Sequence, residues 1–541
     1  MNEQSFDYVI VGAGSAGCVL ANRLSEDPSI SVALLEAGGR DWNMWIHIPA
    51  GYYRNIPNPN VTWQFPSEPE PHLDNRSINQ PRGRVLGGSS SINGLLYVRG
   101  QAQDYDVWRQ LSNVGWSHDD VLPYFKKSEG QVRGADTHHG ADGPLGVDDV
   151  RMDNPLCEAF IKSCRADGIP FTRDFNGASQ EGVGYYQLTN RSGRRCSSAV
   201  AYLNPIRARK NLSIITHAVT ERVLLDGKRA IGIAARVQGQ PATIKARHEV
   251  ILSAGAFGSP QILQLSGIGP ADVLKSAGID VRHDLPGVGE NLQDHFQVRC
   301  LYECNAPGSL NDVWHSRWLQ LRTGLDYIFR QRGILTIGAG VVGAFIKSHP
   351  SLETPDLQIH FIPLTADGPG QDLHPFPGVN VSMCQLRPES RGHLRIASAD
   401  PTARPKILYN YLQTESDRRV MREGVRISRR IVTHKPFADL IVREIAPGVA
   451  VQSDDEVDAF MRQKGTTIFH PVGTCKMGSD PAAVVDARLR VHGIEGLRVA
   501  DGSIMPTLVS GNTNAPIIMI GEKAADMIKA DAQAVAANRT A

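Results

Sequence analysis

The chain opens with a strand, a glycine-rich turn and a helix in immediate succession. Residues 6–11 form a short apolar, β-branched run that is typical of a buried parallel strand. Gly12, Gly14 and Gly17 follow at the spacing G-x-G-x-x-G, and residues 15–25 then take a helical period. Such glycines permit a tight turn, a close approach of a pyrophosphate to the backbone, and close packing of the helix on its strand. Because the N–H groups at a helix N-terminus favour phosphates, we predict a dinucleotide site here.

A second strand, residues 31–36, ends on an acid at Glu36. A carboxylate in this position accepts both hydroxyls of an adenosine ribose and repels a 2′-phosphate. A glycine-rich turn alone is a weak signal, because ordinary loops contain one, but here strand, helix, second strand and acid occur in order. The position of the motif at the start of a long chain favours FAD over NAD.

Charge and composition narrow the class of protein. The net charge of +1 over 541 residues argues against nucleic acid as the main partner, which would need a basic surface. The uncharged stretch 333–346 is glycine-rich and too short for a spanning helix, which needs about 20 apolar residues. The first strand begins at Phe6 with no basic and apolar leader before it. We therefore expect a cytoplasmic protein, with its eight scattered cysteines reduced and no metal site.

The sequence pattern divides the rest of the chain into regions. Residues 39–80 form a long, aromatic- and proline-rich segment of the kind that often covers a site. Further strands are predicted between 211 and 255, followed by a helix that we expect to start at 258–260, with Pro260 in its first turn. From about 300 to 465 the pattern becomes that of an antiparallel sheet with helices on one face, which indicates a second domain.

Residues 415–432 are predicted to form a basic amphipathic helix in that second domain. At about 100° per residue, its apolar side chains gather on one face and six arginines on the other. Such a helix can lie on a membrane surface, which would give the protein a peripheral contact with the inner membrane. The interpretation we favour is the commoner one, a surface helix with a solvated basic face.

A second glycine-rich turn lies at residues 82–94. Gly87 and Gly88 are followed by three serines, whose backbone and hydroxyl groups could contact phosphates or the edge of a ring. The alternative is a helix N-cap, for which serine is a preferred residue. The turn alone does not decide between them.

Two polar residues near the C-terminus are candidates for chemistry. His470 precedes a proline in a turn, and Asn512 lies just before the last predicted helix. Histidine is the usual general base near neutral pH, and an asparagine beside it holds a substrate oxygen without competing for the proton. From composition alone, a structural role for one of 17 histidines would be the commoner outcome.

Together these motifs resemble the glucose–methanol–choline (GMC) family of FAD-dependent oxidoreductases, and within it the bacterial choline-dehydrogenase-like alcohol dehydrogenases. The resemblance spans nearly the whole chain and rests on 12–17 with Glu36, 83–93, 255–269, 470–474 and 501–503. It implies a Rossmann-like FAD-binding domain of α/β class, with an inserted α+β substrate domain built on an antiparallel sheet with helices. The implied limits are 1–155, 196–300 and 466–541 for the FAD-binding domain, and 156–195 and 301–465 for the substrate domain.

The resemblance also implies roles for individual residues. His470 is expected to act as the base at the flavin face, with Asn512 as its partner. Ile92 occupies the place where some relatives tether the flavin through a histidine, so FAD should be bound non-covalently. The expected contacts to FAD are Gly12, Gly14, Ser15, Ala16, Gly17, Glu36, Ala37, Leu86, Gly88, Ser89, Ser90, Asn93, Gly94, Val219, Asp501, Asn512 and Thr513.

The activity that the resemblance implies is oxidation of a primary alcohol to the aldehyde. His470 would take the hydroxyl proton while the α-hydrogen leaves as hydride to the flavin. The particular alcohol, the oligomeric state and the electron acceptor, whether a quinone, another carrier or dioxygen, stay open. Three alternatives remain: a non-redox FAD-containing lyase of the same fold, a light-driven fatty-acid decarboxylase, which would lack His470, and a flavoprotein that senses without turnover.

Overall fold

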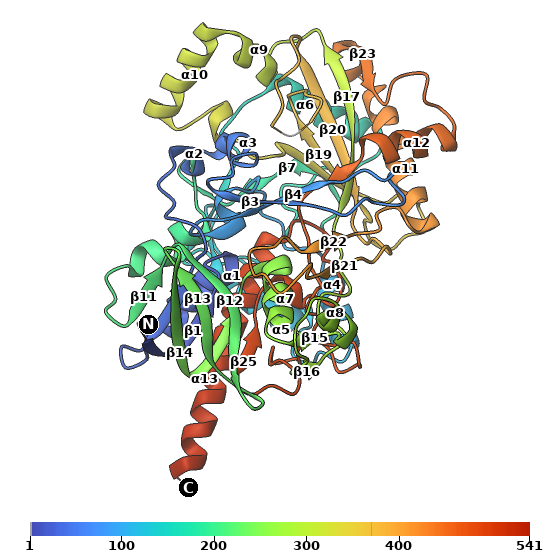
Figure 1. Cartoon of the computed structure of the whole chain (residues 1–541). Coiled ribbons are helices and arrows are strands. Elements are labelled where there is room, and N and C mark those ends of the chain that lie inside the picture. The colour runs from blue at the N-terminus through green and yellow to red at the C-terminus, as the bar shows by residue number, and fades with distance from the viewer. Residues whose placement is uncertain (1–2, 369, 541) are drawn as a thin grey trace.

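The computed structural model describes residues 3–368 and 370–540 and consists of two stacked halves (Figure 1). Each half is built on one seven-stranded sheet and has its own large cluster of buried hydrophobic side chains. The hairpin of β3 (Thr62–Pro66) and β4 (Asn79–Gly83) runs between the two halves (Figure 1).

The first sheet contains the strands predicted near the N-terminus and between 211 and 255, together with one strand near the C-terminus. They are β1 (Glu3–Val11), β2 (Val32–Leu35), β11 (Leu212–Ile215), β12 (Ala218–Asp226), β13 (Arg229–Val237), β14 (Gln240–Leu252) and β25 (Leu497–Val499). The order is β11-β2-β1-β14-β13-β12, with β25 paired to β14. The pairs around β1 are parallel, and all four residues of β2 are buried. Burial of the parallel strands β1 and β2 on both faces explains their apolar runs, whereas β12, β13 and β14 pair antiparallel.

The second sheet is antiparallel in every described pair. Its strands are β7 (Gly182–Tyr185), β17 (Phe296–Cys304), β18 (Val342–Ile346), β19 (Leu357–Ile362), β20 (Gly378–Gln385), β23 (Ile441–Ala446) and β24 (Thr466–Thr467). The order is β23-β17-β20-β19-β18-β7, with β24 on β17. The helices α6 (Pro155–Ala166) and α11 (Glu415–Val432) pack on one face, which leaves the other face toward the first half. The division of the chain into five segments stays a prediction. Two of its limits, near 300 and near 466, fall within β17 and at the start of β24, and these two strands pair with each other in the second sheet.

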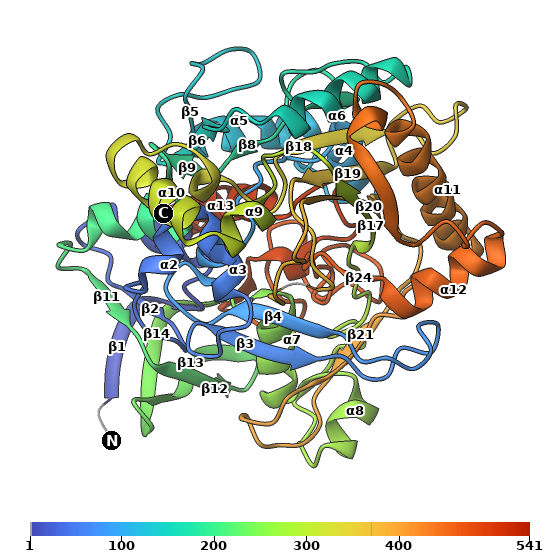
Figure 2. The same ribbon diagram turned by 90° about the horizontal axis from the view of Figure 1, so that it is seen from above.

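The remaining elements surround these two sheets (Figure 2). The other helices are α1 (Ser15–Leu24), α2 (Met44–His47), α3 (Tyr52–Asn55), α4 (Ala102–Gln110), α5 (His118–Ser128), α7 (Gly255–Leu265), α8 (Ala271–Ser276), α9 (Leu310–His315), α10 (Arg317–Arg330), α12 (Asp454–Lys464) and α13 (Asn514–Thr540). The short strands are β5 (Glu129–Gln131), β6 (Leu145–Asp149), β8 (Gln187–Leu188), β9 (Asn190–Arg191), β10 (Arg194–Arg195), β15 (Ile268–Gly269), β16 (His283–Asp284), β21 (His393–Arg395) and β22 (Lys406–Leu408).

The start of α7 was predicted wrongly. The helix begins at Gly255, so Pro260 lies inside it rather than in its first turn. A proline there cannot donate to the carbonyl four residues earlier, which is that of Ala256. The hydroxyl of Thr474 donates to this carbonyl at 2.7 Å instead, so the helix continues with its polar groups satisfied. That hydroxyl comes from a segment far along the chain, which is why the local pattern pointed to a later start.

Helix α11 has the predicted bounds and buries its apolar face, but its basic face is not simply solvated. Arg422 pairs with Glu415 and Asp458, Arg429 with Glu444, and Arg430 with Asp167. These acids lie on α11 itself and on neighbouring elements, where the helix period could not reveal them. The arginines therefore bind the helix to the rest of its own half.

Two absences concern the described part of the chain. Within residues 3–368 and 370–540, no helix combines the length and the apolar character needed to cross a bilayer. The same residues contain no group of histidines, cysteines and acids that could hold a metal ion. All eight cysteines are free, as predicted, and each of them is buried.

Candidate active site

A cavity of about 760 Å³ lies between the two halves. On one side it is lined by the turns that follow β1 and β14 and by the N-terminus of α13. On the other side it is lined by β17, β19 and β20 of the second sheet. Residues between 52 and 65 close part of it, so the long segment 39–80 covers a site, as its composition indicated.

The G-x-G-x-x-G turn forms an open anion cradle at the first side. Gly14 precedes α1, and no side chain caps the first N–H groups of that helix. A Cβ added at Gly14 would meet nothing nearer than the Ser253 carbonyl oxygen at 3.9 Å, so a pyrophosphate has room beside the backbone. At Gly12 and Gly17 an added Cβ would approach backbone oxygens to 2.5 and 1.9 Å, so both positions require glycine for packing.

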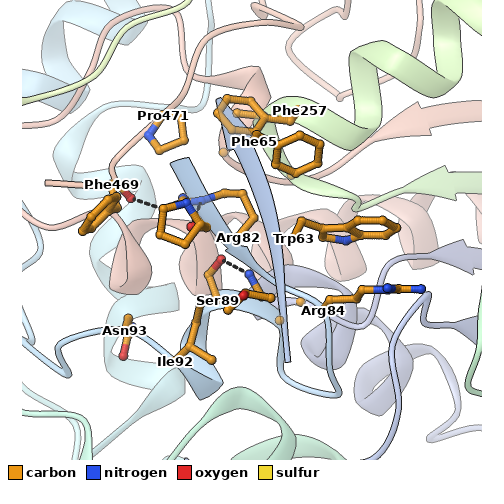
Figure 3. Close-up of a pocket in the computed structure, with 18 of the residues that line it drawn as sticks. Trp63, Phe65, Arg82, Arg84, Ser89, Ile92, Asn93, Phe257, Phe469 and Pro471 are labelled. Carbon is orange, nitrogen blue, oxygen red and sulfur yellow. Dashed lines mark hydrogen bonds between the residues drawn. The ribbon is translucent and has the colours of Figure 1, made fainter. Parts of the chain in front are cut away.

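The second glycine-rich turn lies directly against the first. Gly88 has a φ of +52°, and a Cβ added to it would come within 2.7 Å of the Gly14 Cα atom. Ser89 accepts a hydrogen bond from the Gly83 N–H at 3.1 Å, and its side chain lines the cavity (Figure 3). The two motifs, which are far apart in the sequence, therefore form one surface.

Glu36 is buried at the end of β2 and lines the cavity. Its carboxylate accepts the N–H groups of Ala13 and Gly38 at 3.1 and 2.9 Å. Burial raises the pKa of this carboxyl to about 7, against the lowering effect of those two hydrogen bonds. A carboxylate oxygen accepts more than one hydrogen bond, so Glu36 retains capacity for ribose hydroxyls.

Two further helix N-termini reach the cavity beside α1. The first residues of α7 and α13 line it, and their dipoles favour negative charge there. Asp501, after β25, accepts the Gly255 N–H at 2.8 Å and the Ser259 hydroxyl at 2.5 Å, so it holds the start of α7 in place. These groups fit the parts of FAD. The three helix N-termini and the open glycine backbone suit its phosphates, and Glu36 stands where an acid binds the ribose of adenosine.

Most of the residues predicted to contact FAD line this one cavity, and three do not. Those that line it are Gly12, Gly14, Ser15, Ala16, Glu36, Ala37, Gly88, Ser89, Asn93, Gly94, Val219, Asp501, Asn512 and Thr513, together with His470 and Ile92. Gly17 packs α1 against the Gly12 carbonyl, and Leu86 is a core residue. Ser90 donates to the Gly87 carbonyl and accepts from the Ser198 N–H, so its hydroxyl is already engaged.

The hydrogen bonds of two histidines fix the tautomer of His470. His295 Nε2 lies 3.1 Å from the Leu386 carbonyl oxygen, which only accepts, so this nitrogen carries the proton of the neutral ring. His295 Nδ1 is then an acceptor, and His470 Nδ1, 2.9 Å away, donates to it. His470 Nε2 is left with its lone pair, and the Asn512 side-chain amide donates to it at 3.1 Å. His470 therefore offers an unprotonated nitrogen at the cavity, as a general base must.

The turn that carries His470 is held by buried polar groups. The His470 N–H donates to Asp294 at 2.7 Å, and the same carboxylate accepts the hydroxyls of Thr467 and Tyr411. Phe469 has a φ of +70°, and its carbonyl accepts a hydrogen bond from Arg82 at 2.9 Å (Figure 3). Phe469 therefore keeps its strained backbone conformation because hydrogen bonds hold the turn at two points, the Phe469 carbonyl and the His470 N–H.

Three histidines near the cavity are held neutral by burial. Burial lowers the pKa of His470 well below its ordinary value, and the nearby His295, His360 and Arg82 lower it further. Burial also lowers the pKa of His295 to about 4 and that of His360 to about 3. The base is consequently available over a wide range of pH.

The second sheet supplies residues that the sequence pattern did not reveal. Alternate residues of three strands face the cavity, among them Gln297 and Arg299 on β17, Ser382 on β20 and His360 on β19. Gln358 donates to the Asn512 side-chain carbonyl at 3.1 Å and so orients its amide toward His470. The sequence did carry one signal for these residues, polar side chains at alternate positions of predicted strands. It did not show which strands are neighbours in the sheet, so it could not show that these side chains meet in one cavity.

Aromatic side chains close the cavity near the β3–β4 hairpin (Figure 3). The rings of Phe65 and Phe257 meet edge to face at 5.4 Å, and the Arg84 guanidinium lies over Trp63 at 4.3 Å. Such contacts pack these side chains against one another where the hairpin borders the cavity.

The parallel strands around β1, the two glycine turns and Glu36 define a dinucleotide-binding protein as the class. Family models described as GMC oxidoreductase match residues 6–297 and 388–521. The chain belongs to the GMC oxidoreductase family, as the motifs predicted, and its cofactor is FAD.

Relatives cover almost the entire chain. An oxygen-dependent choline dehydrogenase of Photobacterium profundum is 45% identical over 97% of this chain and 93% of its own length. An alcohol dehydrogenase [acceptor] of Pseudomonas putida is 45% identical over 97% of this chain and 95% of its own. Among solved structures, a pyridoxine 4-oxidase from Mesorbium loti has a TM-score of 0.87 at 32% identity, covering 96% of this chain and 98% of that one. The protein is thus a family member that acts on CH–OH donors.

Proposed function

We propose that the protein oxidises a primary alcohol to the aldehyde, with His470 as the general base. The observation that carries the proposal is the unprotonated Nε2 of His470, fixed by His295 and facing the cavity beside Asn512. FAD, when bound, supplies the acceptor for the hydride that an alcohol loses on oxidation.

The residues of this chain would act on the hydroxyl group. The Asn512 amide orients the alcohol oxygen, and His470 Nε2 accepts its proton. His295 is a positioning residue, because its hydrogen bond to His470 Nδ1 determines which nitrogen faces the substrate. Asp294 is a second positioning residue, because its carboxylate accepts the backbone N–H of His470 and so holds the turn that carries the base.

The test is an anaerobic screen of alcohols with the purified holoenzyme. Bleaching of the flavin absorbance by a primary alcohol, with an aldehyde as product, is the expected result. Admission of air afterwards, with and without a soluble quinone, identifies the electron acceptor. Failure of every alcohol to bleach the flavin would contradict the proposal and favour the lyase.

We also propose that FAD is bound without a covalent tether. Ile92 lines the cavity beside Asn93 and offers no nucleophilic atom. Acid precipitation should therefore release the yellow colour into the supernatant. Colour that stays in the pellet would contradict this.

A further inference from the structure

Arg299 is a half-buried cation on the substrate side of the cavity without a protein partner. It lies on β17 and lines the cavity, and among the described residues no hydrogen bond or ion pair involves its guanidinium. Two fully buried arginines elsewhere in the fold are engaged: Arg195 donates to the Ile46, Ser90 and Asn93 oxygens, and Arg498 pairs with Glu249 and Asp531. The guanidinium of Arg299 lacks such partners in the described part of the chain and faces the cavity, so it is free to bind a ligand there.

The surroundings of Arg299 contain donors and no acid. Of the described residues that line the cavity, only Glu36 and Asp501 carry carboxylates, and both lie on the FAD side. Ser382 sits opposite Arg299 in the strand register, and His360 sits opposite Ser382. The phenol rings of Tyr52 and Tyr53 also lie near the guanidinium. A cationic substrate would find no counter-ion here, whereas an anion would find one positive charge and several neutral donors.

Arg299 lies at a distance from the base that a short carbon chain can span. Gln297 and Gln358 both pair with Cys384, so these three residues form one row across the strands of the sheet. Gln358 donates a hydrogen bond to Asn512, so this row lies next to the partner of the base. Arg299 is in the next row, and residues two apart on a strand are separated by about 7 Å. A substrate whose hydroxyl reaches His470 would therefore present its far end to Arg299.

Building on the proposed function, we propose that the substrate is a primary alcohol that carries a carboxylate at its other end. The guanidinium of Arg299 binds that carboxylate in the bidentate geometry for which arginine is suited, and the hydroxyl is oxidised at His470. The single charge of Arg299 matches a carboxylate. Arg299 thus selects against a quaternary ammonium alcohol such as choline, the compound named in several of the relatives.

The test compares matched alcohols in anaerobic flavin reduction by the holoenzyme: 6-hydroxyhexanoate, 1-hexanol and choline. We expect 6-hydroxyhexanoate to have the highest kcat/KM. Arg299→Gln should lower that value about 10- to 100-fold, mainly through KM, as for a lost hydrogen bond to a charged group, and should leave 1-hexanol within about threefold. Arg299→Lys should retain part of the preference, and Arg299→Glu should shift it toward choline.

Controls separate this inference from the proposed function. Arg443→Gln removes a positive charge from the neighbouring strand β23, outside the cavity, and should leave the preference unchanged. Binding of unreactive hexanoate, measured by its shift of the unfolding temperature, should be lost in Arg299→Gln. If 1-hexanol bleaches the flavin but the hydroxy acid is no better, or if Arg299→Gln affects both alike, the inference is overturned. If no alcohol bleaches the flavin, the proposed function itself fails.

A separate surface is formed by the exposed face of α10. None of the 14 residues of this helix is buried. Its outer face carries the apolar side chains Trp318, Leu321, Leu325, Ile328 and Phe329, of which Phe329 is 80% exposed. At 100° per residue they span an arc of about 100°, with Arg317 and Arg322 at its two edges. Figures 1 and 2 show α9 and α10 at the periphery of the second half, beside α2 and α3.

We infer that α10 lies on an anionic lipid surface, with its apolar face in the headgroup region. An apolar arc between two arginines matches both the hydrocarbon boundary and the negative charge of such a surface. The membrane contact considered for residues 415–432 is thereby assigned to a different helix. Five of the six arginines of α11 are paired with acids, whereas Arg317 and Arg322 are exposed and form no ion pair with a described residue.

Sedimentation of the full chain with vesicles tests this second inference. Binding should be strong with phosphatidylcholine–phosphatidylglycerol vesicles, weak with phosphatidylcholine alone, and reduced at least tenfold in the double variant Ile328→Asp, Phe329→Asp. Val442→Asp, at an exposed apolar residue of β23, is the matched control and should bind as the wild type does. Equal binding of the double variant, or a dimer in light scattering that only the double variant loses, would overturn the inference.

Discussion

The two sides of the cavity are built in different ways. The FAD side presents mainly backbone groups, at the open Gly14 and at the N-termini of α1, α7 and α13. Its one acidic side chain near the first turn, Glu36, is itself held by two backbone N–H groups. The substrate side presents side chains from alternate positions of three strands, such as Arg299 and His360. Changes on the FAD side should therefore alter cofactor affinity, and changes on the substrate side should alter rate and selectivity. The predictions below test that separation.

The largest effect is expected on the substrate side, at His470. A general base contributes typically ~10²–10⁴-fold in rate, so His470→Ala should slow anaerobic flavin reduction by about that factor. FAD content should stay at the wild-type level, because the cradle for the cofactor is made of other segments. Stopped-flow absorbance at the flavin band measures the rate, and the absorbance ratio of flavin to protein measures the content. A near wild-type rate would remove His470 from the mechanism.

On the FAD side, Glu36→Ala should weaken cofactor binding without a comparable loss of rate. Ribose hydroxyls would lose a charged acceptor, which costs about 1–3 kcal/mol of affinity. Glu36→Gln is the milder variant, since its side-chain oxygen can still accept one N–H. Titration of apoprotein with FAD, followed by protein fluorescence, gives the dissociation constants. An unchanged constant in Glu36→Ala would show that the acid does not bind the ribose.

Coupling between His470 and Asn512 tests whether they act on one oxygen. The double variant His470→Ala, Asn512→Ala should lose less than the product of the two single losses, by a coupling of about 0.5–3 kcal/mol. His470→Ala combined with Glu36→Gln is the control, and its effects should multiply because the two residues lie on opposite sides of the cavity. Strict multiplication in the first pair would mean independent roles.

The smallest expected effect is that of pH on the rate. The base must be unprotonated, and burial lowers the pKa of His470 well below its ordinary value, so acid should inhibit only far below pH 6.5. The reduction rate at pH 5.5 should stay within about twofold of that at pH 7.5, whereas a histidine of ordinary pKa would lose about tenfold. A tenfold fall at pH 5.5, with flavin still bound, would contradict the lowered pKa.

Stability should follow pH with a definite sign. His295 and His360, with pKa values of about 4 and about 3, stay neutral in the fold but take up protons below pH 6.5 when the chain is unfolded. The free energy of unfolding should therefore fall as the pH drops from 6.5 toward 4. Thermal unfolding of wild type and His360→Gln measures this, and the variant should lose less stability over that interval.

The FAD side could be predicted because its signals are local in sequence. Gly14, Glu36, Asn93 and Asn512 stand in short motifs whose spacing follows from the turn they make. His470, although it belongs to the substrate side, could be predicted for the same reason, because it also stands in a local turn motif. The rest of the substrate side could not, because β17, β19 and β20 become neighbours only through long-range pairing. His295, Gln358 and Arg299 therefore escaped notice, and so did the acids that neutralise α11. Thr474 escaped notice for the same reason, because it satisfies the carbonyl left free by Pro260 from a distant part of the chain.

The hydrogen bond from Ser15 to Asn514, at 2.8 Å, joins the first helix of the chain to the last. During synthesis the N-terminal turn leaves the ribosome long before the segment that completes its surroundings. Ile517 is the last described residue in the chain that lines the cavity, so FAD has a finished site only after it has emerged. Until then the nascent protein has to hold its first sheet together without the cofactor. Ribosome-bound chains arrested before Asn512 should retain no flavin fluorescence. Full-length chains that stay attached to the ribosome through a C-terminal extension should retain it.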